Sequence, residues 1–206
     1  MRIPKNHNEE FLIGQGFGKV VGIDEVGRGA WAGPLVAGAV RLPLNKKLYK
    51  IRDSKLLFTS EREKIARKIA KSRAIFGLGI IEVEEINRIG LAKALNLAYR
   101  RALANLKIKP DFVLIDGARV KNLDLPQKAI IKGDMYCASI AAASIMAKVA
   151  RDRLMRQLAR KYQQYGFEKN KGYGTKQHQR ALAKYGACEI HREYRPIKEL
   201  KLKTKK

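Results

Sequence analysis

Short apolar runs rich in β-branched residues alternate with longer helical periods along this chain, and their order limits the folds open to it. Five runs are typical of strands, at 19–24, 35–40, 74–83, 112–115 and 129–131. Three stretches have a helical pattern, at 60–71, 84–106 and 135–162. Hairpin-type strands come first and strand–helix alternation follows. This order predicts an α/β fold, a mixed sheet with helices on its faces.

The predicted helices differ in how strongly their residues mark them. Ser60 and Glu63 have capping-box spacing and would open the first helix. The stretch 84–106 is expected to be one continuous helix with Leu91, Leu95, Ala98 and Ala102 on one face. The last helix has an apolar stripe of Ile140, Ala143, Ala147, Ala150 and Leu154. Small residues at 141–144 let this helix lie close to a sheet.

The charge balance indicates the kind of partner. Lys and Arg number 44 against 19 Asp and Glu, a formal net charge of +25, so a polyanion is the expected partner. Residues 148–180 hold ten basic and two acidic residues, and Arg153, Arg156 and Arg160 fall on one helix face. A solvated face is the simpler interpretation, but in so basic a chain we favour a phosphate-binding track.

Several protein classes are excluded at this stage. No apolar run approaches the ~20 residues that cross a bilayer, and residues 1–10 contain no apolar signal-peptide core. Cys137 and Cys188 are too few for a disulfide framework and are expected to be reduced thiols. We therefore expect a cytoplasmic, monomeric protein with no membrane partner. Cys188 and His191 form a lone Cys-x-x-His, which is weak as a zinc signal.

Acidic residues stand at the ends of predicted elements. Asp24 and Glu25 end the first strand, Asp116 ends the strand 112–115, and Asp134 directly precedes the last helix. If the two strands are parallel neighbours, Asp24 and Asp116 lie side by side at one sheet edge, where ligands bind in such sheets. Asp24 and Glu25 would point to opposite faces of a regular strand, so both reach one site only if the strand ends or bulges there.

Each acid also has a simpler interpretation. Asp134 could only cap a helix, the pair Asp116-Gly117 could be a turn, and Asp24 and Glu25 could simply be solvated. As a cluster, however, the carboxylates would repel one another unless a divalent cation were present. Oxygen ligands select Mg²⁺ or Mn²⁺, and two such ions can assist phosphodiester hydrolysis. The four acids are therefore a candidate site for a pair of Mg²⁺ or Mn²⁺ ions, with the simpler interpretations still open.

Two glycine-containing segments are candidate substrate contacts. Gly27, Arg28 and Gly29 follow the acidic pair, and glycines let backbone N–H groups approach a phosphate or a sugar. Tyr173 lies between two glycines and two lysines, where an exposed ring could stack on a sugar or base. Ordinary turns are the alternative for both segments.

These residues resemble the motifs of the bacterial ribonuclease HII family. The blocks occur in family order at 22–29 (GIDEVGRG), 33–34, 53–56 (DSKL), 116–117, 132–134 (KGD), 139–149, 151–152, 166–167, 171–175 (KGYGT), 178 and 191–192. They span about residues 19 to 197, so the resemblance covers most of the chain. The chain departs from the family pattern at Ala30, at Asn170 and at 193–196 (EYRP), none of which is a carboxylate position.

The resemblance implies a ribonuclease H-like mixed five-stranded sheet flanked by helices, with a C-terminal helical segment. It implies an endoribonuclease that cleaves the RNA strand of RNA–DNA hybrids and cuts 5′ of single ribonucleotides in duplex DNA, leaving 3′-hydroxyl and 5′-phosphate ends. Residues Asp24, Glu25, Asp116 and Asp134 fall on its catalytic, metal-binding positions. Substrate-binding positions correspond to Gly27, Arg28, Gly29 and Tyr173.

The shift to basic and aromatic composition near residue 161, together with this resemblance, predicts that the chain has three parts. They are a loose lead-in at 1–18, a catalytic domain at 19–160 and a basic substrate-binding segment at 161–206.

Two alternative functions remain. A basic nucleic-acid-binding protein without activity would explain the charge but not the four acids. The second alternative is another enzyme of the ribonuclease H-like superfamily, such as ribonuclease HIII or a resolvase. Ribonuclease HIII has a similar core but a substantial N-terminal domain, for which we expect the 18 residues before Lys19 to be too few.

Overall fold

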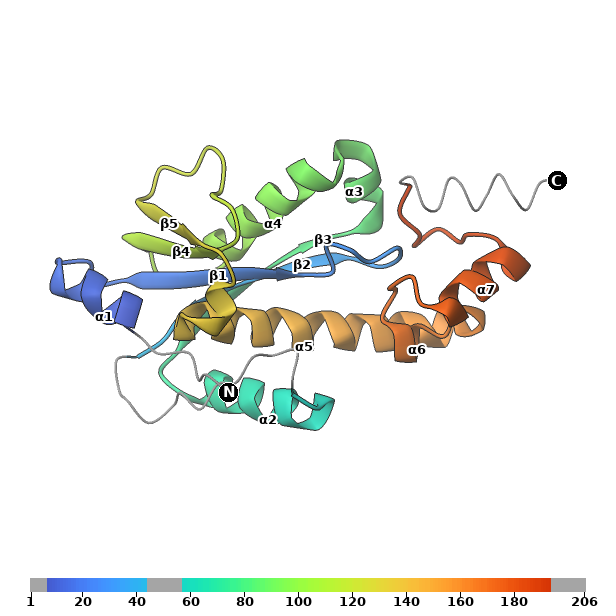
Figure 1. Ribbon diagram of the computed structural model, residues 1–206, viewed down its shortest axis with the longest axis horizontal. Helices are drawn as coiled ribbons and strands as arrows, with labels where there is room; N and C mark the ends of the chain where they lie inside the picture. The colour runs from blue at the N-terminus through green and yellow to red at the C-terminus, as the bar shows by residue number, and fades with distance from the viewer. Residues whose placement is uncertain (1–6, 44–56, 194–206) are drawn as a thin grey trace.

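A five-stranded mixed sheet forms the centre of the computed structural model, which describes residues 7–43 and 57–193 (Figure 1). The strand order is β3-β2-β1-β4-β5, with antiparallel pairing of β1 with β2 and β2 with β3, and parallel pairing of β1 with β4 and β4 with β5. The strands are β1 (Val20–Val26), β2 (Leu35–Arg41), β3 (Ile75–Ile81), β4 (Phe112–Asp116) and β5 (Gln127–Ile130). The predicted mixed sheet is confirmed.

Helices cover both faces of this sheet (Figure 1). Helix α4 (Leu91–Ala104), preceded by α3 (Val83–Ile89), packs on one face, and α5 (Ala138–Lys161) packs on the other with α2 (Thr59–Lys71) beside it. The remaining elements are α1 (His7–Gly14), α6 (Phe167–Asn170), α7 (Lys176–Tyr185) and the short 3-10 turns η1 (Gly133–Met135) and η2 (Gln163–Tyr165). No helix in the described ranges is long and apolar enough to cross a membrane.

Helix α5 lies directly on the strands, as its small residues predict. A Cβ atom on Gly22 would lie 2.3 Å from the backbone N of Ile140, and one on Gly38 would lie 2.4 Å from the carbonyl O of Ala143. These distances are too short for any side chain at either glycine. Glycines on the strands and small residues on the helix therefore bring α5 against β1 and β2.

Four local expectations are wrong. The stretch 84–106 is two helices, because Gly90 has a φ of +80° and interrupts it. Helix α2 begins at Thr59, and it is Glu61, through the backbone N of Phe58, that caps it at 3.0 Å. The last helix begins at Ala138 because η1 occupies the preceding turn. The lead-in contains α1, whose Leu12 is buried.

The C-terminal elements pack on the end of α5. One apolar cluster contains Met155 of this helix, the residues Tyr162, Tyr165 and Phe167 that follow it, and Ala32 from the β1–β2 loop. Helix α7 adds further residues to the cluster. The loop after β1 is thereby in contact with a segment more than a hundred residues later in the chain. The motif at 53–55 lies outside the described residues.

Candidate active site

The predicted carboxylates lie around the carboxyl ends of β1 and β4. The parallel register pairs Ile23 with Ile115, so Asp24 and Asp116 follow at the same level of neighbouring strands. The carboxylate of Asp116 accepts a hydrogen bond from the backbone N–H of Gly133 at 2.6 Å, which holds η1 at this edge. Asp134 is buried in that turn, 2% exposed. Asp134 therefore belongs to a turn held by Asp116 and does not cap α5.

Asp24 and Glu25 point to opposite faces of the sheet. Strand β1 pairs with β2 without a bulge as far as Val26, so the condition under which both acids would reach one site is not met on this side. The Asp24 carboxylate meets the Ser144 side chain of α5, whereas Glu25 accepts a hydrogen bond from the Tyr99 hydroxyl of α4. Pairing with β4 stops before both residues, which leaves that side of β1 open.

Negative charge is concentrated at this edge. Burial, followed by the charges of Glu25 and Asp116, raises the pKa of Asp24 from 3.8 to about 8. Burial also raises the pKa of Glu25, and the Asp116 charge adds to this, while the Tyr99 hydroxyl and the Arg28 guanidinium act in the opposite direction. Arg28 is largely exposed and its guanidinium is 3.9 Å from Glu25. Arg28 is therefore too exposed and too far away to neutralise the negative charge of these carboxylates.

These carboxylates fit a divalent cation chemically. All are hard oxygen donors, and a cation among them would offset the burial and the repulsion that raise the pKa of Asp24. Within 7–43 and 57–193, no three His, Cys, Asp or Glu side chains already lie close enough to hold one ion. The residues therefore supply the donors and the charge, but their side chains are not arranged as a closed coordination shell.

The loop after β1 has a fixed backbone. Gly27 has a φ of +95°, and a Cβ atom there would lie 2.2 Å from Nε of Arg151. Gly29 has open space at its Cβ position, and Arg28 between them is exposed. Packing against Arg151 therefore explains the glycine at 27, while Arg28 and Gly29 remain accessible from outside.

The Tyr173 loop is hydrogen-bonded to this first loop. The carbonyl of Gly172 accepts hydrogen bonds from the backbone N–H groups of Trp31 at 2.8 Å and Ala32 at 3.1 Å. The Tyr173 ring is half-buried, with Cζ of Arg151 5.3 Å from its centroid. The structure thus brings the two predicted substrate-binding segments side by side.

Two buried arginines, which the sequence reasoning did not single out as site residues, hold these loops. Arg151 donates to the carbonyls of Pro34 (2.8 Å), Lys171 (2.9 Å) and Ala32 (3.1 Å). Arg192 donates to the carbonyls of Gly33 and Arg28. Both are fully buried. The glycine-rich loops leave carbonyls without strand partners, which is the one sequence signal that could have pointed to such donors.

Two buried histidines extend this support. His178 Nδ1 lies 3.0 Å from the carbonyl O of Tyr173, and its Nε2 lies 3.0 Å from Nε2 of His191. Nδ1 of His191 accepts from the backbone N–H of Cys188 at 3.0 Å. The ring nitrogens of His191 thus face different partners, and the Cys-x-x-His residues help hold the Tyr173 loop.

Comparisons with known proteins agree with this arrangement. The family model for Ribonuclease HII matches residues 21–197. A Ribonuclease HII of Caldicellulosiruptor bescii is 45% identical over 196 residues, covering 93% of this chain and 95% of the relative. The chain belongs to the ribonuclease HII family. It is therefore an endoribonuclease, a hydrolase with ribonuclease H activity on RNA–DNA hybrids.

Solved structures related to ribonuclease HII share the fold. The ribonuclease H2 from Pyrococcus horikoshii superposes with a TM-score of 0.76 at 26% identity, covering 91% of this chain and 99% of that one. Bst-RNase HIII, solved in complex with Mn²⁺, gives a TM-score of 0.70 at 20% identity, covering 90% and 69% respectively. The predicted ribonuclease H-like sheet with flanking helices is confirmed.

Proposed function

We propose that this ribonuclease HII cuts on the 5′ side of a single ribonucleotide in duplex DNA, as well as within RNA–DNA hybrids. The cut would leave 3′-hydroxyl and 5′-phosphate ends. The observation that carries the proposal is that the Tyr173 loop is hydrogen-bonded through Gly172 to Trp31 and Ala32, in the loop that also contains Gly27, Arg28 and Gly29 and directly follows Glu25. One site can thereby examine a sugar and its neighbour at the same time as the scissile phosphate.

The four carboxylates are proposed to hold divalent ions. Asp24, Glu25, Asp116 and Asp134 are the donors, and the ions when bound would orient a water and stabilise the leaving oxygen. The raised pKa of Asp24 supports this role because a cation would stabilise its charged form. The Mn²⁺ complex of a structural neighbour agrees with it. Mg²⁺ or Mn²⁺, acting as a pair, is the proposed cofactor.

The loops are proposed to recognise the sugar. Backbone groups of Gly27, Arg28 and Gly29 would contact the 2′-hydroxyl, the group that distinguishes RNA from DNA. The ring of Tyr173 would pack on the next deoxyribose, which has no 2′-hydroxyl to obstruct it. Residues 19–160 then act as the catalytic domain, 161–206 as the substrate-binding segment and 1–18 as a lead-in. We further propose a monomer that acts in the cytoplasm.

A cleavage assay tests the proposal directly. The substrates are a labelled duplex with one ribonucleotide and a continuous hybrid, each with Mg²⁺, with Mn²⁺ or with EDTA. We expect metal-dependent cuts 5′ of the ribonucleotide, with 3′ ends that a polymerase extends and 5′ ends that a ligase joins. We expect Asp24→Asn to abolish cleavage while hybrid binding survives, because binding comes from Lys and Arg.

The matched control is Asp124→Asn, an exposed loop aspartate that should leave cleavage unchanged. Cleavage by Asp24→Asn within about tenfold of wild type, a barrier change of only ~1.4 kcal/mol, would show that Asp24 is not essential. Cleavage of the hybrid without any cut at the single ribonucleotide would reject the finer activity and leave the family activity intact.

A further inference from the structure

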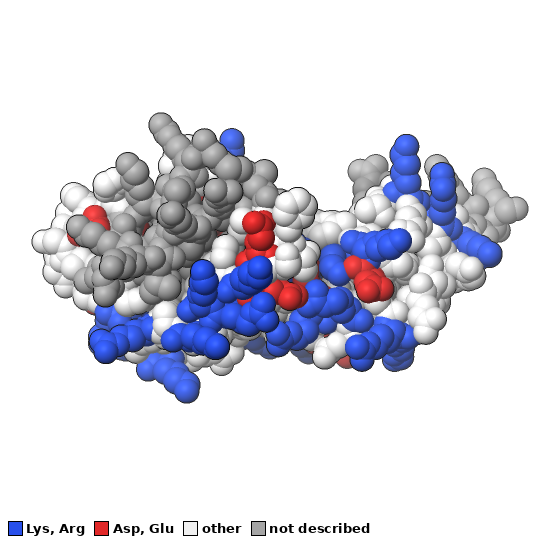
Figure 2. All heavy atoms as spheres, turned by 90° about the horizontal axis from the view of Figure 1, so that it is seen from below, with Lys and Arg blue, Asp and Glu red and all other residues white. Residues whose placement is uncertain are grey.

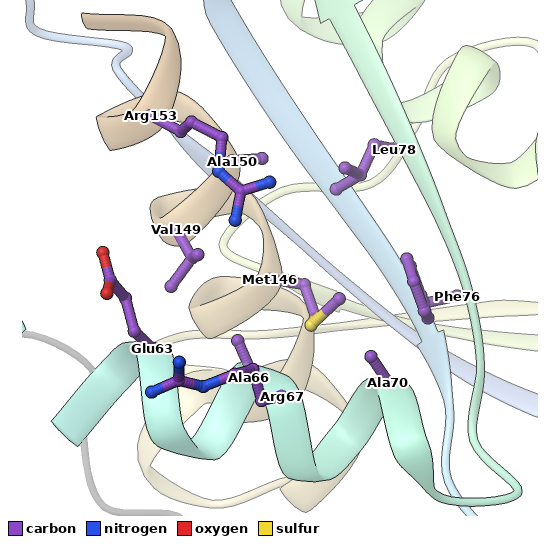
Figure 3. Close-up of a pocket in the computed structure, with 10 residues that line it drawn as sticks. All are labelled: Glu63, Ala66, Arg67, Ala70, Phe76, Leu78, Met146, Val149, Ala150 and Arg153. Carbon is purple, nitrogen blue, oxygen red and sulfur yellow. The ribbon is translucent and has the colours of Figure 1, made fainter. Parts of the chain in front are cut away.

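A hollow lies between α2, α5 and the edge strand β3, away from the proposed reaction (Figure 3). Its volume is about 280 Å³. The floor is apolar and comes from Phe76 and Leu78 of β3 and from Met146 and Val149 of α5 (Figure 3). We call this hollow, with its lining on α2, the α2–α5 groove. Strand β3 is the outermost strand on one side of the sheet. It lies two strands away from β1, whose carboxyl end holds Asp24.

Small side chains create the groove. Ala66 and Ala70 of α2 and Ala150 of α5 line the hollow, and larger residues at these positions would fill the space (Figure 3). Both helices present their lining at the i, i+3, i+4, i+7 spacing of a single helical face, from residue 63 on α2 and from residue 146 on α5. The groove is therefore lined by one face of each helix, with apolar residues at its floor and charged residues at its rim.

The rim of the groove is positively charged. Arg67 and Arg153 are exposed there, and neither has an acidic partner at ion-pair distance among the residues that the structure describes. Glu63 also lines the groove but pairs with Arg156 at 2.8 Å. A band of Lys and Arg crosses this face of the molecule (Figure 2).

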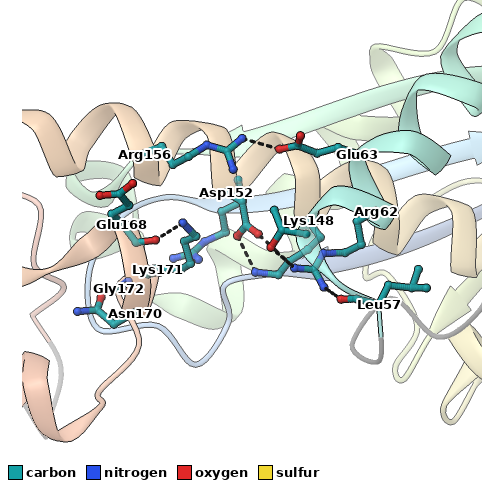
Figure 4. Close-up of polar contacts among 12 residues, drawn as sticks. Leu57, Arg62, Glu63, Lys148, Asp152, Arg156, Glu168, Asn170, Lys171 and Gly172 are labelled. Carbon is teal, nitrogen blue, oxygen red and sulfur yellow. Dashed lines mark hydrogen bonds and ion pairs between the residues drawn. The ribbon is translucent and has the colours of Figure 1, made fainter.

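Basic residues outnumber acids next to the groove as well (Figure 4). Lys148 at 2.6 Å and Arg62 at 3.9 Å share the buried carboxylate of Asp152. Burial lowers the pKa of Lys171; the charge of Asp152 acts in the opposite direction, and the charges of Arg156 and Lys148 lower the pKa further. The local excess of positive charge thus extends beyond the rim, and it favours an anionic partner.

We propose that the α2–α5 groove binds an acidic segment of another protein, whose apolar side chains cover the floor and whose carboxylates pair with Arg67 and Arg153. The chain's own undescribed segments have the wrong charge for this site. Residues 1–6 have two basic residues and no acid, 44–56 have five and one, and 194–206 have six and one. A second copy with a net charge of +25 would also be repelled.

A nucleic-acid backbone is the other anion available, and it fits the groove less well. Phosphates would satisfy the arginines but would leave the floor of Phe76, Leu78, Met146 and Val149 uncovered. Burial of apolar area is worth roughly 25 cal/mol per Å², and only an apolar side chain gains it. The apolar floor therefore favours a peptide over a duplex.

Fluorescence anisotropy with the full-length protein tests the proposal. The probe is a dye-labelled peptide with Leu at helical i, i+3, i+4, i+7 positions and Glu between them, and its control has Ser in place of Leu. We expect the Leu peptide to bind at physiological salt and the Ser peptide to bind at least about tenfold more weakly, which is ~1.4 kcal/mol. Ala70→Glu, which blocks the groove, and Arg67→Glu, which reverses a rim charge, should each weaken binding of the Leu peptide.

The matched control is Lys68→Glu, an exposed position on α2 that turns away from the groove. It should bind the Leu peptide as wild type does, and all three variants should cleave the hybrid at the wild-type rate and unfold at the wild-type temperature. Absence of binding, or equal binding of both peptides, would overturn the proposal. Loss of hybrid binding in Ala70→Glu and Arg67→Glu but not in Lys68→Glu would instead assign the surface to nucleic acid, and would also overturn it.

Discussion

Arg151 connects the two loops that flank the carboxylates. Its guanidinium donates to carbonyls of Ala32 and Pro34 in one loop and Lys171 in the other, and it faces the Tyr173 ring. Hydrogen bonds from a charged donor contribute about 1.5–3 kcal/mol each, and three of them converge on this buried group. Arg151 therefore holds the Tyr173 loop against the first loop and lies over one face of the Tyr173 ring.

Substitution of Tyr173 should reduce turnover on the single-ribonucleotide duplex more than on a continuous hybrid. We expect Tyr173→Ala to lose about tenfold or more in turnover on the single-ribonucleotide duplex, ~1.4 kcal/mol of barrier, and less on a continuous hybrid. The reason is that a ring packing on deoxyribose matters most where a deoxyribose follows the ribonucleotide. Tyr173→Phe keeps the ring and is the matched control. Turnover on both substrates and thermal unfolding provide the measurement.

A purely structural tyrosine would behave differently. Its loss would lower the melting temperature and reduce turnover equally on both substrates. Equal losses with a lowered melting temperature would assign Tyr173 to the turn and reject its role at the junction.

The contact between α5 and the sheet sets the geometry of the carboxylate edge. Ser144 of this helix reaches Asp24, and Gly38 lies so close to Ala143 that a Cβ atom would be 2.4 Å from its carbonyl O. The neighbouring atom is backbone, so it cannot rotate away. A methyl group at Gly38 would therefore push α5 from β2.

Gly38→Ala should destabilise the protein. We expect a loss of about 1–3 kcal/mol in the free energy of unfolding, the usual cost of overpacking a core. Gly29→Ala is the matched control, because nothing lies within 4 Å of its Cβ position, and its change should stay within about 0.5 kcal/mol. Chemical denaturation of both variants measures the difference. Equal stabilities would contradict the close contact between α5 and the sheet.

Local patterns predicted the elements better than their ends. Apolar runs and helical periods identified all five strands and the long helix, because burial on a sheet imposes those periods. The break at Gly90 was missed because a single glycine does not interrupt an apolar period. The cap at Phe58 was missed because its side chain has no hydrogen-bonding group, and only the Glu61 carboxylate reveals it.

The candidate site was predictable only in part. Asp24 and Asp116 could be placed together because parallel strands end at one edge. The opposite directions of Asp24 and Glu25 depended on whether β1 bulges, which strand pairing decides and a motif does not. The roles of Arg151 and Arg192 were not predicted, since their partners are backbone carbonyls that the fold brings together from separate loops.

At the scale of the whole molecule, the basic residues that attract a polyanion are distinct from the carboxylates proposed for catalysis. The carboxylates form a small negative cluster at one sheet edge, while the chain as a whole carries a net charge of +25. Long-range attraction therefore brings a polyanion to the protein, and the local carboxylates do not contribute to it. Affinity and cleavage should accordingly respond to different changes in solution.

Salt should weaken hybrid binding steeply. Each phosphate neutralised by a Lys or Arg releases counterions from the duplex, so six to ten contacts imply a loss of about a thousandfold or more between roughly 50 and 200 mM salt. Sequence preference should be slight, because backbone contacts do not read bases. Binding of Asp24→Asn to a hybrid, measured across this range without cleavage, gives the slope. A flat response would show that Lys and Arg do not contact the phosphates, and residues 148–180 would then be a solvated surface.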